Sequence, residues 1–379
     1  MIAGTALCIT GQSAVSLFGH SAAERIRRQF ARAGITTCLA PAAAAQHDGP
    51  VIVVRADAAI DQPLIAVLIE TPKLLLVGES PIGPAPLAAH VRAGEVAATI
   101  SNLAGATSTA LDLNARSPGQ LDVKFWKALR KRETPYAFAV SPANAAAVEW
   151  RMFIGTYKGA TDIVTKYLWP RPAFHLTRYL APRGITPNMV TALAAILTVL
   201  AFWLFLRGDF AVGLAAAWAM TFLDTVDGKL ARITLTSSKW GDIFDHGIDL
   251  VHPPFWYVAW GLGLAKAGYE WPAVTFWWVI AIILAGYIVQ RIMEGIAIKW
   301  LGLEIHIWRK IDTLFRQVTA RRNPNLILLT AGAILGRPDW SLMAVAAWTL
   351  ACLLLHGLQL LQALEQRRRG PLVSWMMQG

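Results

Sequence analysis

Four aspartates are spaced so that their carboxylates can gather in one place. Asp224 and Asp227 are three residues apart, so they share one face of a helix. Asp245 and Asp249 are four residues apart and share a face in the same way. The two pairs lie at the ends of neighbouring apolar segments that a short connection joins, and helices joined in this way pack antiparallel. We therefore expect the two pairs to face each other.

Acids at this depth in a membrane segment need compensation. An ionised carboxylate inside a membrane costs about 3 kcal/mol, and neighbouring carboxylates raise one another's pKa. Divalent cations remove both penalties, and oxygen ligands without His or Cys at ligand spacing favour Mg²⁺ or Mn²⁺ over zinc. Four carboxylates are enough for two such ions, the arrangement that holds the attacking and leaving oxygens in phosphoryl transfer. The alternative is structural, with Lys229, Arg232 and Lys239 as counter-charges at two helix ends.

The residues next to these acids suit a ligand that approaches the helix closely. Gly228 leaves no side chain beside Asp227, and Ala231 is small and lies about one turn further on. Arg232 adds a planar cation that suits a phosphate or one of the acids. Gly241 permits close contact between helices near the proposed metal site.

The full pattern is D-x2-D-G-x2-A-R-x8-G-x3-D-x3-D, from Asp224 to Asp249. It resembles the signature of the CDP-alcohol phosphotransferase (CDP-alcohol phosphatidyltransferase) family. The resemblance covers roughly residues 158–364 and implies six membrane helices preceded by an amphipathic one. It also implies the reaction, in which an acceptor hydroxyl cleaves the diphosphate of a CDP-alcohol and CMP is released.

The resemblance further implies a role for each matching residue. The expected metal ligands are Asp224, Asp227, Asp245 and Asp249. Asp249 also resembles the family's base, which takes the proton of the acceptor. The positions expected to bind the CDP donor are Gly228, Ala231, Arg232, Ser238, Gly241 and Asn188. Simple helix capping is an equal alternative for Asn188. The residues considered for the acceptor are Lys158, Arg171, Arg309 and Arg316, although membrane orientation and anionic lipid also explain basic residues of this kind.

The composition of the whole chain argues against a wholly soluble protein, and the long apolar segments lie in its second half. Of the 379 residues 55% are hydrophobic and 16% are charged, against about 25% charged residues in soluble domains. The predicted crossings are 187–207, 209–232, 241–264, 271–295, 324–337 and 339–364, the fifth being short enough for a re-entrant helix. Lys and Arg gather on one side of them, which predicts a cell inner membrane protein with cytoplasmic termini and active site. Much of the net charge of +11 is thus a topology signal, which argues against nucleic acid as a partner.

The first half is predicted to be a soluble α/β domain. Strands are expected at 5–10, 51–54 and 73–77 and an amphipathic helix at 22–33, an alternation typical of a parallel sheet covered by helices. The expected domains are the α/β domain over 1–150, a juxtamembrane amphipathic helix and linker over 151–186, the six-helix domain over 187–366 and a basic tail over 367–379.

This α/β half resembles the nucleotidyltransferase domain of bifunctional inositol-1-phosphate cytidylyltransferase and di-myo-inositol-phosphate-phosphate synthase fusions. The resemblance lies in Gly19-x5-Arg25-x8-Ala33-Gly34-Ile35 and in the run from Val53 to Asp57. The loop over 9–19 holds no Arg or Lys, so a triphosphate would be poorly neutralised there. We therefore expect a degenerate domain that docks or regulates.

The sequence thus predicts an integral membrane transferase with two Mg²⁺ or Mn²⁺ ions. Its donor would be CDP-diacylglycerol or a CDP-linked small alcohol, and its acceptor a hydroxyl compound, with the fusion-like layout favouring an inositol phosphate. The family resemblance implies a homodimer in contact with membrane lipids. Two alternatives stay open: a cation or metabolite transporter that uses the same acids, and a catalytically silent membrane scaffold.

Overall fold

The computed structural model of the chain describes residues 4–105, 111–123, 125–126, 129–236 and 239–377, without the side chains of 239, 240, 242, 245 and 246. The chain divides into two compact units. The first, here called the α/β unit, consists of Met1–Tyr157, Thr177–Gly184 and Lys229–Thr236. The second, here called the helical unit, consists of Lys158–Leu176, Ile185–Gly228 and Ser237–Gly379.

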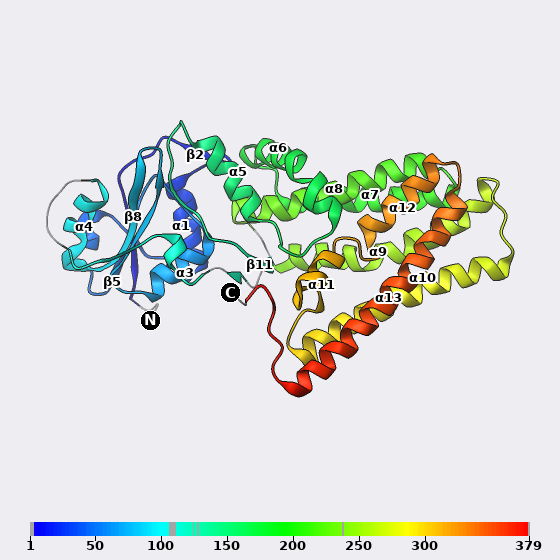
Figure 1. The fold of residues 1–379 in the computed structure, drawn as a ribbon. Helices are drawn as coiled ribbons and strands as arrows, with labels where there is room; N and C mark the ends of the chain where they lie inside the picture. The colour runs from blue at the N-terminus through cyan, green and yellow to red at the C-terminus, as the bar shows by residue number, and fades with distance from the viewer. Residues whose placement is uncertain (1–3, 106–110, 124, 127–128, 237–238, 378–379) are drawn as a thin grey trace. The chain divides into compact units, whose positions relative to one another are not determined.

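The α/β unit is built on one mixed sheet (Figure 1). The order of its strands is β4-β1-β5-β8-β7-β12-β6. Its strands are β1 (Ala6–Thr10), β4 (Cys38–Leu39), β5 (Pro50–Arg55), β6 (Ala58–Ile60), β7 (Leu74–Ser80), β8 (Gly83–Arg92) and β12 (Ala137–Ala139). β9 (Asn114–Arg116) pairs with β7 beside this path. Two small hairpins join β2 (Ser16–Leu17) to β3 (His20–Ser21) and β10 (Phe125–Trp126) to β11 (Lys131–Arg132). The strands predicted at 5–10, 51–54 and 73–77 are confirmed as β1, β5 and β7.

The prediction of a parallel sheet is wrong for the middle of the sheet. β1 runs parallel to both β4 and β5, as expected, but β8 runs antiparallel to both β5 and β7. The cause is a tight turn between β7 and β8, in which Ser80 Oγ donates to the carbonyl of Gly83 at 2.6 Å. A short turn can join only antiparallel neighbours, because parallel strands need a long crossover.

Helices cover both faces of this sheet because β5 alternates its side chains. Ile52 and Val54 pack in a cluster with α1 (Ala22–Arg32) and α3 (Gln62–Glu70), whereas Val51 and Val53 pack in a cluster with α2 (Pro41–Ala44) and α4 (Val96–Leu103). α1, the predicted amphipathic helix, buries Ile26 and Phe30 and is capped by Ser21, which accepts from the Glu24 amide at 3.1 Å. α5 (Ala145–Gly155) follows β12.

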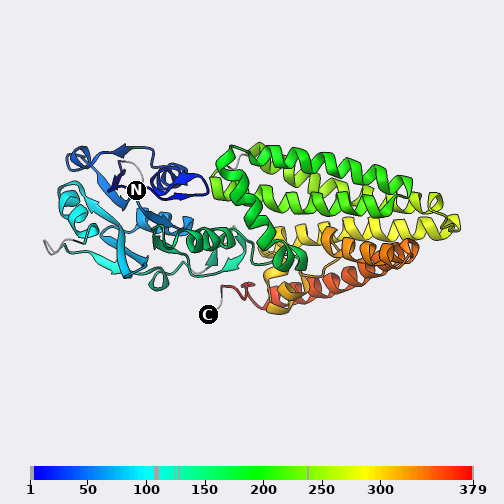
Figure 2. The same ribbon diagram turned by 90° about the horizontal axis from the view of Figure 1, so that it is seen from above.

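The helical unit consists of long helices that lie side by side (Figure 2). They are α7 (Pro187–Arg207), α8 (Phe210–Thr234), α9 (Lys239–Lys266), α10 (Ala273–Ile296), α12 (Arg322–Ile334) and α13 (Pro338–Arg369). The shorter helices are η4 (Val164–Leu168), α6 (Pro170–Leu180), η6 (Ala297–Leu301), η7 (Ile305–Ile307) and α11 (Lys310–Phe315). α7 packs on α9, and α13 packs on α9, α10 and α12. Phe205 and Trp260 meet at 5.1 Å between ring centroids in the core between α7 and α9.

Four helices in the described part of the chain are long and apolar enough to cross a membrane: Pro187–Arg207, Phe210–Thr234, Ala273–Leu301 and Pro338–Arg369. α9 and α12 occupy the two other predicted segments, but α12 has 13 residues, fewer than the roughly 20 that span a bilayer. The count of six crossings therefore stays a prediction. α7 begins as expected, with Pro187 as its first residue and Thr186 accepting from the Met189 amide at 3.3 Å.

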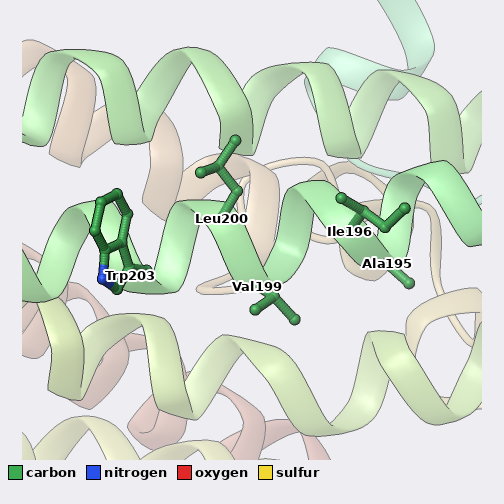
Figure 3. Close-up of a pocket in the computed structure, with 5 residues that line it drawn as sticks. All are labelled: Ala195, Ile196, Val199, Leu200 and Trp203. Carbon is green, nitrogen blue, oxygen red and sulfur yellow. The ribbon is translucent and has the colours of Figure 1, made fainter.

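A shallow apolar groove runs along α7 (Figure 3). Its lining is Ala195, Ile196, Val199, Leu200 and Trp203. These side chains carry no titratable group, and Val199 and Ile196 are exposed. The groove therefore offers a surface for hydrocarbon and no chemistry for a reaction.

Candidate active site at an aspartate cluster

Asp227 of α8 is held by α7. Its side chain is buried, and Thr191 Oγ1 donates to Asp227 Oδ2 at 2.6 Å. Asp227 Oδ1 is buried as well and has no hydrogen-bond partner among the described residues. A buried carboxylate oxygen without a partner is costly unless a further donor or a cation satisfies it. Sequence reasoning missed Thr191, although its position one turn after Pro187 places it at the start of α7.

Arg322 joins the two acidic helices. Its Nη2 donates to Asp224 Oδ2 of α8 at 2.5 Å, and its Nη1 donates to Asp249 Oδ1 of α9. The side chains of Arg322 and Asp224 are 15% and 16% exposed, whereas that of Asp249 is 41% exposed. A planar guanidinium suits two carboxylates at once. The structure thus brings Asp224 and Asp249 together on one cation, at the start of α12.

Two further predicted residues fall where the structure gives no side chain. Asp245 lies one turn before Asp249 on α9, but its side chain, like all of Ser238, is outside the described residues. Among the side chains that are described, no three or more His, Cys, Asp or Glu form a group that could hold a metal ion. Gly241 lies in the first turn of α9.

The described carboxylates nevertheless fit a hard divalent cation in their chemistry. Asp227 offers a buried oxygen without a partner, and Asp224 and Asp249 already share a positive charge from Arg322. Carboxylate oxygens are the ligands that Mg²⁺ and Mn²⁺ prefer. Any such cation would meet Arg322 as a competitor for Asp224 and Asp249.

The residues considered for the CDP donor follow the acids along α8. Gly228 comes directly after Asp227, and Ala231 and Arg232 lie in the last two turns of the helix. Arg232 Nη1 donates to the carbonyl of Thr156 at 3.4 Å. Asn188 is exposed as the second residue of α7.

The residues considered for the acceptor are dispersed. Arg309 is engaged by Asp312, with 2.9 Å between Nη2 and Oδ1. Arg171 is exposed on α6, and Lys158 lies in the segment before η4. Arg316 differs from these, because its Nη1 is buried and has no hydrogen-bond partner among the described residues. Burial, together with the charge of Arg321, lowers the pKa of Arg316 to about 9, so it is still a cation at pH 7.

Arg316 belongs to a polar cluster that the sequence did not reveal. We call it the Glu294 cluster; it consists of Arg291, Glu294, His306, Arg316, Arg321 and His356. Glu294 Oε1 accepts from Arg291 at 3.0 Å, from His306 at 3.0 Å and from Arg321. Only Arg291 and Glu294 have a local signal, a spacing of three on one helix.

The Glu294 cluster carries an excess of positive charge. Burial lowers the pKa of His306 to about 3, so this imidazole is neutral at pH 7 and three guanidiniums face one carboxylate. Buried nitrogens without hydrogen-bond partners in the described structure include Arg291 Nε, Arg321 Nε and both ring nitrogens of His356. Such an arrangement suits an anion with several oxygen acceptors.

Comparison with known proteins connects this site to one family. Residues 184–321 match the family model described as CDP-alcohol phosphatidyltransferase, and the whole aspartate pattern lies inside that segment. Archaetidylinositol phosphate synthase of Pyrococcus horikoshii is 39% identical over 80 residues, 21% of this chain and 42% of that protein. Cholinephosphotransferase 1 of Gallus gallus is 31% identical over 127 residues, 31% of this chain and 36% of that protein. An uncharacterized CDP-alcohol phosphatidyltransferase class-I family protein of Schizosaccharomyces pombe is 31% identical over 106 residues.

These matches support the CDP-alcohol phosphatidyltransferase family for the matched segment, and with it a transferase of groups that contain phosphate. The chain spans less than half the length of each of these three relatives, between 28% and 42%. The residues before 184 lie outside the match to the family model. The resemblance of the α/β half to nucleotidyltransferases therefore stays a prediction.

Proposed function

We propose that the chain is an integral membrane transferase that moves a phosphoalcohol group from a CDP-alcohol donor to a hydroxyl acceptor and releases CMP. The observation that carries this proposal is that Asp224 and Asp249, two members of the aspartate pattern on two different helices, both contact Arg322, and that the pattern lies within the segment matched by the family model. The four helices of membrane-spanning length support a multi-pass protein. Its location in an inner membrane, with the acids and both termini on the cytoplasmic side, is part of the proposal.

In this proposal Asp249 is the base. It is the most exposed of the three described aspartates, so an acceptor hydroxyl can reach it. As the acceptor oxygen bonds to the phosphorus next to the donor's alcohol, the bond from that phosphorus to the bridging oxygen breaks. CMP leaves with the bonding electron pair, and Asp249 takes the hydroxyl proton.

The remaining acids would hold the metal. Asp224, Asp227, Asp245 and Asp249 are the proposed ligands of two Mg²⁺ or Mn²⁺ ions. When bound, these ions would neutralise the diphosphate and make the acceptor hydroxyl easier to deprotonate. Thr191 fixes one oxygen of Asp227 and leaves its other oxygen for a cation. The proposed CDP-binding residues are Gly228, Ala231, Arg232, Ser238, Gly241 and Asn188.

The Glu294 cluster supports an acceptor that itself carries a phosphate. Its three guanidiniums exceed its one carboxylate, and Arg316 Nη1 is buried without a described partner. The relative from Pyrococcus horikoshii is named an archaetidylinositol phosphate synthase. We therefore propose an inositol phosphate or a related phosphorylated polyol as acceptor, with Arg316 as its main ligand and Lys158, Arg171 and Arg309 as further candidates.

The test is release of CMP from labelled CDP-alcohols by the purified full chain, over a panel of donors and acceptors. Asp249→Asn should abolish turnover while nucleotide binding is retained, because the amide cannot take a proton. Asp209→Asn is the control, since Asp209 pairs with Arg207 between α7 and α8. Metal flux across vesicles without CMP would instead indicate a transporter, and neither activity would indicate a scaffold. Full turnover by Asp249→Asn would refute the role as base.

A further inference from the structure

The last turns of α8 belong to the α/β unit. Lys229–Thr236 forms one compact unit with Met1–Tyr157, although α8 runs without a break from Phe210 to Thr234. The same helix therefore carries Asp224 and Asp227 in the helical unit and ends among residues of the α/β unit. What holds this end therefore bears on the positions in the last turns of α8.

Two arginines of α1 cap the C-terminal end of α8. Arg25 Nη1 donates to the carbonyl of Ile233, and Arg28 Nη1 donates to the carbonyl of Thr234 at 3.3 Å. The last carbonyls of a helix lack partners within it and form the negative end of its dipole, so guanidiniums are suitable caps. Arg25 is 7% exposed and Ile233 is 1% exposed, so water cannot easily replace this bond.

Two side chains of α8 donate hydrogen bonds to the C-terminal end of α5. The carbonyl of Thr156 accepts from Lys229 Nζ at 3.3 Å and from Arg232 Nη1 at 3.4 Å. Lys229 Nζ also lies 3.5 Å from the centroid of the Tyr157 ring. The α/β unit thus contacts both the backbone end of α8 and two of its cationic side chains.

The α/β unit holds the end of α6 in a similar way. Glu149 of α5 is buried, accepts from the Phe18 amide at 2.8 Å and pairs with Arg178 of α6 at 2.8 Å. Gly19 has a φ of +80°, and a Cβ there would lie 2.6 Å from Cα of Pro182. A glycine is therefore required where the β2–β3 turn meets the segment after α6. Several independent contacts of the α/β unit thus hold the ends of α8 and α6.

We propose that the α/β unit serves to order the end of α8, with Arg25 as the positioning residue, so that Gly228, Ala231 and Arg232 are presented in one arrangement. That these positions receive the CDP donor rests on the proposed function. The task needs no triphosphate chemistry in the α/β unit, in keeping with a loop over 9–19 that lacks Arg and Lys.

The test compares Arg25→Met with Arg27→Met in the full chain. Both substitutions remove a guanidinium from α1, but Arg27 is 62% exposed and pairs with Glu24 of its own helix. Hydrogen exchange of the amides over 229–236 should accelerate about tenfold in Arg25→Met, because a charge-assisted hydrogen bond is lost, and stay unchanged in Arg27→Met. Exchange in β5 should not change in either variant. Arg25→Lys, which keeps a cation near Ile233, should restore part of the protection.

Binding of CMP gives a second readout. Its dissociation constant should rise about tenfold in Arg25→Met, and Arg25→Lys should recover part of the affinity. Unchanged exchange over 229–236, or faster exchange with unchanged CMP affinity, would overturn the proposal. If exchange of Arg25→Met rises throughout the sheet, the same two measurements on Arg28→Met decide the proposal. The side chain of Arg28 is 36% exposed and can be removed without opening the core. A wild-type chain that binds no CMP would refute the proposed function, whereas the exchange measurement would still decide whether Arg25 orders α8.

Discussion

Replacing Arg322 by glutamine should expose the charge balance of the aspartate cluster. In the wild-type chain the guanidinium contacts Asp224 and Asp249 together. Glutamine keeps much of the length of the side chain and removes its charge, so two neighbouring carboxylates lose their shared cation. Each then opposes ionisation of the other. The cluster should become unstable unless another cation takes the place of Arg322.

The size of the effect follows from burial. Removing one partner of a buried ion pair costs about 3–5 kcal/mol. Most of this free energy comes from Asp224, which is 16% exposed, because Asp249 is 41% exposed and is partly screened by water. We expect the free energy of unfolding to fall by about 3 kcal/mol when divalent cations are removed with EDTA. In excess Mn²⁺ the loss should shrink to about 1 kcal/mol or less, because a bound cation compensates both acids.

The assay is unfolding of the full chain in detergent, with EDTA and with Mn²⁺, together with Mn²⁺ titration by electron paramagnetic resonance. Arg322→Gln should bind Mn²⁺ about tenfold more tightly than wild type, because no guanidinium competes. Arg337→Gln is the control, since Arg337 makes a similarly short pair, 2.6 Å, with Asp339 at the start of α13. Equal losses of stability with and without Mn²⁺, joined to an unchanged Mn²⁺ affinity, would refute the reasoning.

Three further substitutions test other parts of the chain. Thr191→Val removes the hydrogen bond to buried Asp227 and should weaken Mn²⁺ binding about tenfold, whereas Thr191→Ser should not, as titration can measure. Arg316→Gln should raise the KM of a phosphorylated acceptor about tenfold and leave the KM of the donor unchanged in the CMP assay. Burial raises the pKa of Asp61 to about 6, so the folded chain binds this proton more tightly than the unfolded chain does. The free energy of unfolding should therefore be highest below about pH 4 and fall by about 3 kcal/mol as the pH rises through about 6. Asp61→Asn keeps the cap of α3 and should abolish this pH dependence in unfolding measured against pH. A pH profile of Asp61→Asn identical to that of the wild type would contradict the prediction.

The sequence could predict those features of the site that depend only on residues close together in the chain. The spacings of Asp224 and Asp227 and of Asp245 and Asp249 place each pair on one helix face, which needs no knowledge of tertiary structure. Arg322 is separated from Asp249 by 73 residues and from Asp224 by 98, so its contact with both depends on how α12 packs. The Glu294 cluster escaped prediction for the same reason, because its members come from several helices and the segments between them.

The error in the sheet has a different cause. β8 contains Pro84 and Pro86, and prolines within a run argue against a central strand. In the structure β8 is central only from Ala88 to Arg92, where it pairs with β5. The two prolines lie in the part of β8 that pairs with β7 alone, so the missing amide donors can face the open side. The sequence therefore gives no clear signal for the antiparallel β7–β8 hairpin, because Pro84 and Pro86 are tolerated where β8 has a partner strand on one side only.

α8 carries both the acids held by the helical unit and the positions held by the α/β unit. Asp227 and Ile233 are six residues apart on α8, about 9 Å along its axis. Thr191 and Arg322 act on the acids before this stretch, and Arg25 acts on the carbonyl after it. Loss of Arg25 should leave the contacts of Asp224 and Asp227 in place and release only the positions beyond Gly228. The α/β unit should therefore govern affinity for the nucleotide, while the helical unit governs the acids and their cations.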